Sequence, residues 1–266
     1  MGNAAASREK TSPLLKVERC GAVLTVGLNR PAKRNALNDG IILAIGETFV
    51  DLPEDIGAVV IHGIGDHFSS GLDLSELSDH DATGGLIHSQ MWHRVFDRIQ
   101  YSRVPVIAAL KGAVIGGGLE LACAAHIRVA EPSAYFALPE GQRGIFVGGG
   151  GSVRLPRLIG VARMTDMMLT GRVYSATEGS SYGFAQYLVE AGGALDKALE
   201  LAARIASNAP LTNFAVLQAL PMIAEASPQV GLVMESLMAT VAQSDKEAKA
   251  RIRAFLDRKA AKVKPT

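Results

Sequence analysis

The sequence has few cysteines, no excess of charge of either sign and no long hydrophobic run. Of its 266 residues only Cys20 and Cys123 are cysteines, which excludes a disulfide framework, and their spacing is not that of metal ligands. We expect both to be small apolar residues in a reducing compartment, and the protein to be cytoplasmic.

Charge and hydropathy exclude two further classes of partner. Lys and Arg number 27 and Asp and Glu 26, so the net charge is +1 and no broad basic surface for nucleic acid is expected. A membrane helix needs about 18 uninterrupted apolar residues. The nearest run, 104–118, contains Lys111, so we expect no membrane partner. Residues 1–12 lack the apolar core of a secretory signal and are predicted to form a disordered tail.

Glycine is the residue in excess. The chain has 28 glycines, about 10.5% of its residues against a typical value of about 7%. They cluster at 116–118 and 148–151. Hydrophobic residues at 48% and charged residues at 20% are otherwise typical of a globular protein.

The first 150 residues alternate between strand and helix patterns. We predict a hairpin of strands 14–20 and 22–28 joined at Gly21, followed by a helix over 37–51 with Asn38 as its N-cap. Further strands are predicted at 58–62, 104–110, 127–130 and 135–138, and further helices at 86–99 and 119–125. This order indicates one layered α/β unit.

After Gly151 the pattern is entirely helical. Helices are predicted at 152–159, 163–170, 176–182, 194–207, 211–224, 231–243 and 245–262. The last of these is amphipathic, with apolar residues on one face and many Lys and Arg residues on the other. We therefore expect the C-terminal helices to pack on a neighbour, such as another subunit.

Two segments present backbone N–H groups. The loop over 69–74 follows a strand and offers the N–H group of Leu72, although many strand-to-helix loops look similar. The glycines at 116–118 precede a helix whose first N–H groups and positive dipole end point the same way. Donors from two such loops together could form an oxyanion hole.

Two carboxylates accompany these loops. Glu120 stands among apolar neighbours, where a carboxylate is costly unless it is paired or functional, although a first-turn Glu is the plain alternative. Glu140 follows Pro139 and could be an ordinary turn acid. As a pair they could hold one water between them, with a further N–H group near Gly148 orienting it. The six histidines lack ligand spacing and are interpreted as surface or loop residues.

Four segments, at 29–37, 68–74, 116–122 and 138–140, resemble the enoyl-CoA hydratase/isomerase (crotonase) superfamily, and the resemblance extends from about residue 14 to 260. It implies an α/β fold: a β-β-α spiral core over 13–207 and a helical C-terminal trimerisation region over 208–266. It also implies a homotrimer or homohexamer and an acyl-CoA thioester substrate of fatty acid metabolism. No separate cofactor is implied, because coenzyme A is part of the substrate.

The resemblance assigns roles to particular residues. It places the oxyanion-hole N–H groups at Leu72 and Gly117, the two catalytic carboxylates at Glu120 and Glu140, and the water-orienting N–H group at Gly148. The residues that it implies for coenzyme A binding are Lys33, Arg34, Ser70, Asp73 and Leu74.

Because both glutamates are present, the resemblance favours a 2-enoyl-CoA hydratase that adds water across the α,β double bond. One alternative is an enoyl-CoA isomerase, which needs a single acid/base. Another is a hydratase acting on a β-thioether substrate, whose product collapses or is hydrolysed. A third is a non-catalytic RNA-binding or scaffold member of the fold. Val147 stands where many hydratases have Pro, so the acyl chain is left open.

Overall fold

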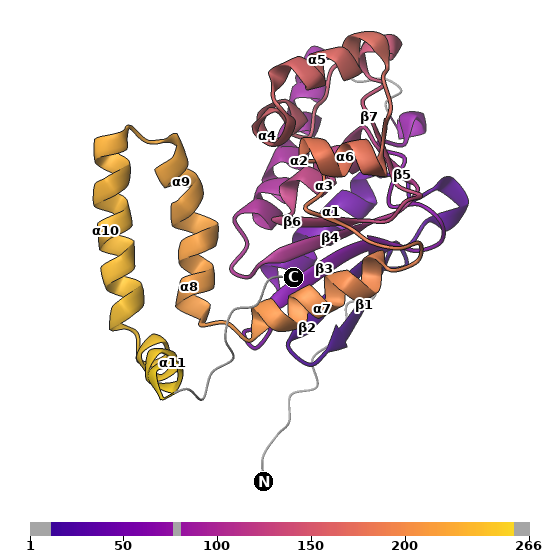
Figure 1. The fold of residues 1–266 in the computed structure, drawn as a ribbon. Coiled ribbons are helices and arrows are strands. Elements are labelled where there is room, and N and C mark those ends of the chain that lie inside the picture. Colours follow the sequence, from indigo (N-terminus) through magenta and orange to yellow (C-terminus); the bar gives the residue numbers. More distant parts are fainter. Residues whose placement is uncertain (1–11, 77–80, 258–266) are drawn as a thin grey trace.

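Two β-sheets with surrounding helices form the larger part of the computed structural model, which describes residues 12–76 and 81–257 (Figure 1). A helical arm lies beside them. The predicted N-terminal tail falls almost wholly outside the described residues, as does the end of the last predicted helix.

The larger sheet has six strands in the order β1-β2-β3-β4-β6-β9. The hairpin of β1 and β2 is antiparallel, as predicted, and the remaining neighbours are parallel. The strands are β1 (Leu15–Cys20), β2 (Val23–Leu28), β3 (Ala58–Gly63), β4 (Val106–Leu110), β6 (Ile127–Ala130) and β9 (Tyr187–Leu188).

A smaller sheet has three strands in the order β5-β7-β8, namely β5 (Ala113–Ile115), β7 (Tyr135–Ala137) and β8 (Tyr174–Ser175). Isolated parallel bridges extend it, joining Leu37 to Leu72 and Ser69 to Val114. Successive turns of the chain therefore run from the larger sheet to the smaller one and then into a helix. This repetition is the β-β-α spiral that the resemblance implied.

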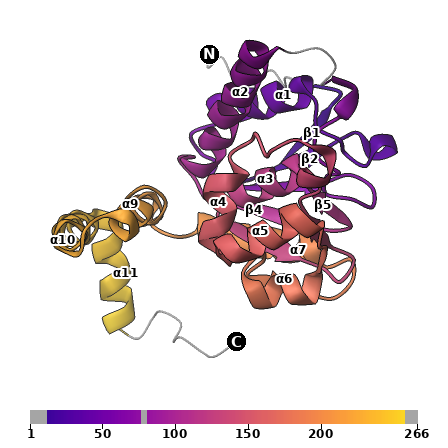
Figure 2. The same ribbon diagram turned by 90° about the horizontal axis from the view of Figure 1, so that it is seen from above.

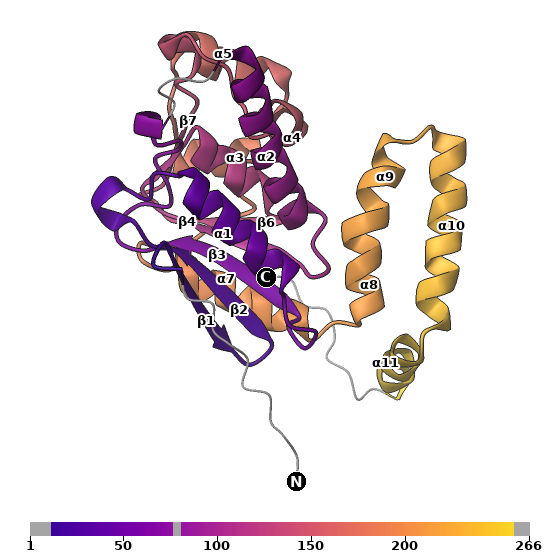
Figure 3. The ribbon, with the colours of Figure 1, turned by 180° about the vertical axis from the view of Figure 1, so that it is seen from behind.

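Seven helices follow the strands of the spiral: α1 (Asp39–Val50), α2 (Ala82–Gln100), α3 (Gly117–Ala124), α4 (Gly151–Ile159), α5 (Val161–Thr170), α6 (Ala176–Tyr182) and α7 (Ala194–Ala206). Residues of α1, α2 and α3 pack on one face of the larger sheet, whereas α7 covers the other face (Figures 1 and 3). Asn38 caps α1 as predicted, because its side chain accepts a hydrogen bond from the N–H group of Ile41.

The arm comprises α8 (Pro210–Phe214), α9 (Leu220–Glu225), α10 (Pro228–Ser244) and α11 (Lys246–Leu256), and it stands apart from the spiral (Figure 2). A π-helical turn over Ala215–Ala219 separates α8 from α9, where a single helix was predicted. Pro221 explains the difference, because it lacks the N–H group that regular helical bonding needs. Polar links to the core include an ion pair of 2.7 Å between Arg157 and Glu225.

Three short strands, β5, β8 and β9, were not predicted. Each has two or three residues, too few to show the period-two alternation by which strands are recognised. The spiral brings β5 and β8 to β7 in the smaller sheet and β9 to β6 in the larger one, and no local sequence window contains this information.

Among the described residues, no helix is long and apolar enough to cross a membrane. Cys20 is exposed and Cys123 is buried, and both are free cysteines. The exposure of Cys20 follows from its place on β1, which is an edge strand of the larger sheet. A cytoplasmic location stays a prediction.

Candidate active site

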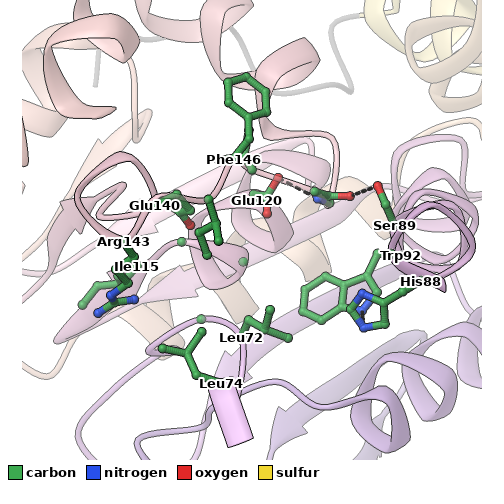
Figure 4. Close-up of a pocket in the computed structure, with 18 of the residues that line it drawn as sticks. Leu72, Leu74, His88, Ser89, Trp92, Ile115, Glu120, Glu140, Arg143 and Phe146 are labelled. Atoms are coloured by element: carbon green, nitrogen blue, oxygen red, sulfur yellow. Dashed lines mark hydrogen bonds between the residues drawn. The ribbon is translucent and has the colours of Figure 1, made fainter. Parts of the chain in front are cut away.

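A cavity of about 390 Å³ opens between α2, the N-terminus of α3 and the segment that follows β7 (Figure 4). It brings together seven of the predicted site residues: Ser70, Leu72, Leu74, Gly117, Glu120, Glu140 and Gly148. Lys33, Arg34 and Asp73 do not line it. In the part of the chain that the structure describes, no group of three or more His, Cys, Asp or Glu side chains could hold a metal ion.

Glu120 is buried in the first turn of α3, with 4% of its surface exposed. Its Oε1 accepts hydrogen bonds from the N–H groups of Gly149, at 2.9 Å, and Gly151, at 2.7 Å. Burial raises the pKa of Glu120, whereas the two N–H groups and the nearby Arg154 guanidinium act to lower it. Burial is the largest of these effects, so the pKa of Glu120 is raised overall, although the hydrogen bonds and the guanidinium favour the ionised form.

The glycine cluster at 148–151 is explained by this close approach. A Cβ atom on Gly149 would lie 3.1 Å from Glu120 Oε2, and one on Gly151 would lie 2.9 Å from Oε1. Only a residue without a side chain lets the backbone N–H groups reach the carboxylate at this distance without displacing it.

Glu140 lies at the turn after β7 and is 7% exposed. Its Oε2 is buried and has no hydrogen-bond partner among the described residues. Burial, together with the negative charge of Glu120, raises the pKa of Glu140 from 4.5 to about 7. An unpartnered carboxyl oxygen facing a cavity is a group available to a bound molecule.

The two predicted N–H donors come from neighbouring backbone segments. The carbonyl of Gly71 and the N–H group of Asp73 both bond to Leu37, so the intervening N–H group of Leu72 points to the opposite side of this extended segment. There a Cβ on Gly117 would lie 3.5 Å from Leu72 N. Gly117 is the first residue of α3, where the N–H group has no acceptor within the helix.

The residues predicted to bind coenzyme A lie in two packed loops. Asp73 accepts hydrogen bonds from Arg30, at 3.0 Å, Lys33, at 2.9 Å, and Ser75, at 2.7 Å. The bonds from Ser75, Lys33 and Arg30 hold the pKa of Asp73 well below its usual range. Arg34 accepts a hydrogen bond from the N–H group of Ser70 through its carbonyl. Asp73 therefore joins the loops, and the role of all five residues toward coenzyme A stays a prediction.

Sequence reasoning missed several residues at the cavity. His88, Ser89 and Trp92 reach it from α2, and Arg143 reaches it from the turn after Glu140 (Figure 4). Trp92 falls within the helix predicted over 86–99, without a predicted role, and it is buried. Its position one helical turn after His88 and Ser89 could have indicated a shared face.

The interpretation of the histidines as surface or loop residues is wrong for two of the five that the structure describes, and His80 lies outside the described residues. His62 is a buried residue of β3, and burial lowers its pKa. His88 lies on α2 at the cavity, where its Nε2 is 2.8 Å from Asp39 Oδ1 and 3.2 Å from Trp92 Nε1. Histidine has a large apolar surface and is often accommodated inside a fold.

Comparisons with known proteins point to one family. The family model for enoyl-CoA hydratase/isomerase matches residues 18–265. The 2,3-dehydroadipyl-CoA hydratase of Escherichia coli is 34% identical over 92% of this chain and 96% of its own length. The short-chain-enoyl-CoA hydratase of Clostridium acetobutylicum is 32% identical over 91% of this chain and 94% of its own length.

Solved structures show the same fold. The crystal structure of a candidate enoyl-CoA hydratase from Rhodopseudomonas palustris is 78% identical, with a TM-score of 0.91, over 94% of this chain and 97% of that one. An enoyl-CoA hydratase from Bacillus anthracis is 29% identical, with a TM-score of 0.87, over 94% of this chain and 99% of that one. The chain therefore belongs to the enoyl-CoA hydratase/isomerase family, within the crotonase superfamily.

Proposed function

We propose that this protein is a 2-enoyl-CoA hydratase, which adds water across the α,β double bond of an acyl-CoA thioester. The observation that carries the proposal is that two carboxyl groups with opposite surroundings face one cavity. Burial raises the pKa of both groups, but Glu120 accepts two backbone hydrogen bonds, whereas Glu140 has a buried oxygen without a partner.

These surroundings assign a role to each carboxyl group. Glu120, held as a hydrogen-bond acceptor, takes a proton from a water molecule while the water oxygen bonds to the β-carbon. Glu140, whose pKa of about 7 keeps a large protonated fraction at neutral pH, delivers a proton to the α-carbon. The proton on Glu120 then returns to Glu140 through solvent, which restores both groups for the next turnover.

In the same proposal the Leu72 and Gly117 N–H groups stabilise the thioester oxygen. Negative charge develops on that oxygen when the β-carbon is attacked, and two fixed donors bind it more strongly in the transition state than in the substrate. One such donor typically contributes about 10²- to 10³-fold in rate. The N–H group of Gly148 would orient the water.

Coenzyme A is part of the substrate, and each of these steps uses only groups of this chain, so the proposal includes no metal or redox cofactor. Lys33 and Arg34 would meet the phosphates, Ser70 and Leu74 would lie near the adenine, and Asp73 would hold Lys33 in place. Ser70 and Leu74 line the cavity, which supports a substrate whose adenine end lies on this side of it.

The proposal includes a homotrimer or homohexamer, and the surface of the arm is the observation that supports it. Its helices expose many large apolar side chains, among them Leu232, Val233, Leu237, Phe255 and Leu256. Exposed apolar groups of this number on one element are typical of an interface between subunits.

The test follows loss of the enoyl absorbance with short, long and aryl 2-enoyl-CoA substrates in H₂¹⁸O. The proposal predicts ¹⁸O at the β-carbon of a 3-hydroxyacyl-CoA product. A shifted double bond without ¹⁸O would instead show an isomerase, and a released thiol from a β-thioether substrate would show collapse after hydration. No reaction with any thioester would contradict the proposal.

A further inference from the structure

Two backbone peptide groups donate hydrogen bonds to Glu120 Oε1, and their carbonyls are held in different ways. The Gly151 N–H group belongs to the Gly150–Gly151 peptide. Its carbonyl accepts from the N–H groups of Val153, at 3.2 Å, and Arg154, at 3.1 Å, in the first turn of α4. This peptide is therefore oriented by the helix itself.

The Gly148–Gly149 peptide is oriented by a side chain from another element. Its N–H group donates to Glu120 Oε1 at 2.9 Å, and its carbonyl accepts from Ser89 Oγ at 2.6 Å (Figure 4). In a trans peptide the N–H and C=O bonds point in opposite directions. A hydroxyl that holds the carbonyl on one side thus directs the N–H group toward the carboxylate on the other.

The Ser89 contact is needed because the peptide lies between two glycines. A peptide between two glycines has more accessible backbone conformations than any other, so without an external partner its plane is poorly fixed. The following peptide, Gly149–Gly150, has such a partner in the buried Arg154, whose Nη1 donates to the Gly149 carbonyl at 3.0 Å. For the Gly148–Gly149 peptide that partner is Ser89.

We propose that Ser89 is a positioning residue, whose hydroxyl fixes the Gly148–Gly149 peptide so that Glu120 stays a proton acceptor. The inference rests on the proposed hydratase function, in which Glu120 takes a proton from water. Ser89 acts through the peptide and need not touch the reacting atoms.

Other charged and titratable groups lie around Glu120 and Ser89. Arg154 approaches from α4, Glu140 from the turn after β7, and Cys123 lies on α3 itself. On α2, His93 Nε2 lies 3.4 Å from Ser89 Oγ. Of these groups only His93 loses a contact when the Ser89 hydroxyl is removed, and it is not among the groups that shift the pKa of Glu120. A shift in the pKa of Glu120 would therefore report the lost orientation of the peptide.

The test compares Ser89→Ala with Ser89→Thr, which keeps a hydroxyl, and with Gln90→Ala, an exposed neighbour on α2. For Ser89→Ala we expect roughly a fivefold lower kcat, with KM nearly unchanged. The acidic limb of the pH profile should move upward by about half a pH unit or more. Ser89→Thr should restore both. A change in KM alone would show that Ser89 only lines the cavity, and would contradict the proposal.

Carbon-13 NMR titration of the glutamate carboxyl carbons gives a readout that does not depend on turnover, with Glu120→Gln assigning the signal. We expect the titration midpoint of Glu120 to rise in Ser89→Ala and to stay in place in Gln90→Ala. An unchanged midpoint in a folded Ser89→Ala protein would contradict the inference. Absence of turnover in the wild type would contradict the hydratase proposal instead.

Discussion

Glu120 and Glu140 line the same cavity, but the backbone around them differs. The glycine segment at 149–151 surrounds Glu120 with N–H donors that favour the ionised carboxylate. The turn after β7 gives Glu140 burial, a negative neighbour and an oxygen without a partner, which favour the protonated acid. Burial raises the pKa of both carboxyl groups, and the backbone around them gives the two identical side chains different hydrogen-bond partners.

The largest effect is expected from removing either carboxyl group. Glu120→Gln and Glu140→Gln should each lower kcat about 10²- to 10⁴-fold, because each removes one acid/base group while keeping the shape of the side chain. Steady-state kinetics on one 2-enoyl-CoA substrate measures this. Glu47→Gln, at an exposed position on α1, is the matched control and should keep the wild-type rate. Full activity in both site variants would show that neither carboxyl group acts as an acid or base in the reaction.

A smaller but still large effect is expected from crowding the Glu120 side. A Cβ on Gly151 would lie 2.8 Å from Glu120 Cγ, so Gly151→Ala should displace the carboxylate and lower kcat about 10²-fold. In Gly40→Ala the new Cβ would lie 3.0 Å from the flexible end of the Leu14 side chain and at ordinary contact distance from Asn38, so this helical control should keep its activity. If Gly151→Ala were as active as Gly40→Ala, the close approach of the Gly151 backbone to Glu120 would not matter for catalysis.

The raised pKa of Glu140 should make the folded protein less stable as the pH rises. The pKa of Glu140 is 4.5 ordinarily and about 7 in the fold, so the folded protein binds this proton more tightly than the unfolded chain. Stability is therefore lost as the pH rises from about 4.5 to about 7. We expect Glu140→Gln to gain up to about 3 kcal/mol in free energy of unfolding, relative to the wild type, between pH 4.5 and pH 8. Urea denaturation at both values measures this, and a pH-independent difference would contradict a raised pKa.

The smallest effect is expected at the mouth of the site. Lys33→Ala should raise KM for acyl-CoA severalfold, less so at high salt, with little change in kcat, because Lys33 is exposed and its charge is screened. Lys16, which is equally exposed and pairs with Glu18 at 2.9 Å, provides the control Lys16→Ala. Equal KM values for the two variants would show that Lys33 does not meet the phosphates.

The spiral and the place of the two glutamates follow from the sequence in large part. The hairpin, the Asn38 cap and the buried helix that carries Glu120 each have a local signature, and the structure confirms them. The sequence predicted that the N–H groups of both glycine clusters face substrate and water, and it did not predict a contact with the Glu120 side chain. In the structure, the cluster at 148–151 meets the Glu120 carboxylate.

What the sequence could not show are contacts made across the fold. Ser89 has no local mark of function, because its hydroxyl acquires meaning only when the spiral places Gly148 beside it. Arg154 is similar, since its buried guanidinium holds a glycine carbonyl while pairing with Asp97 at 2.6 Å. Such residues are selected by geometry between elements, which helical and strand periodicities do not encode.

The most direct measurement is a double-variant cycle on kcat/KM with Glu120→Gln, Glu140→Gln and both together. If the two carboxyl groups act on one water in one step, the loss in the double variant should be close to the loss in the slower single variant. Losses that multiply would show that the two groups act independently, and would contradict the assignment of a proton acceptor and a proton donor to a single addition of water.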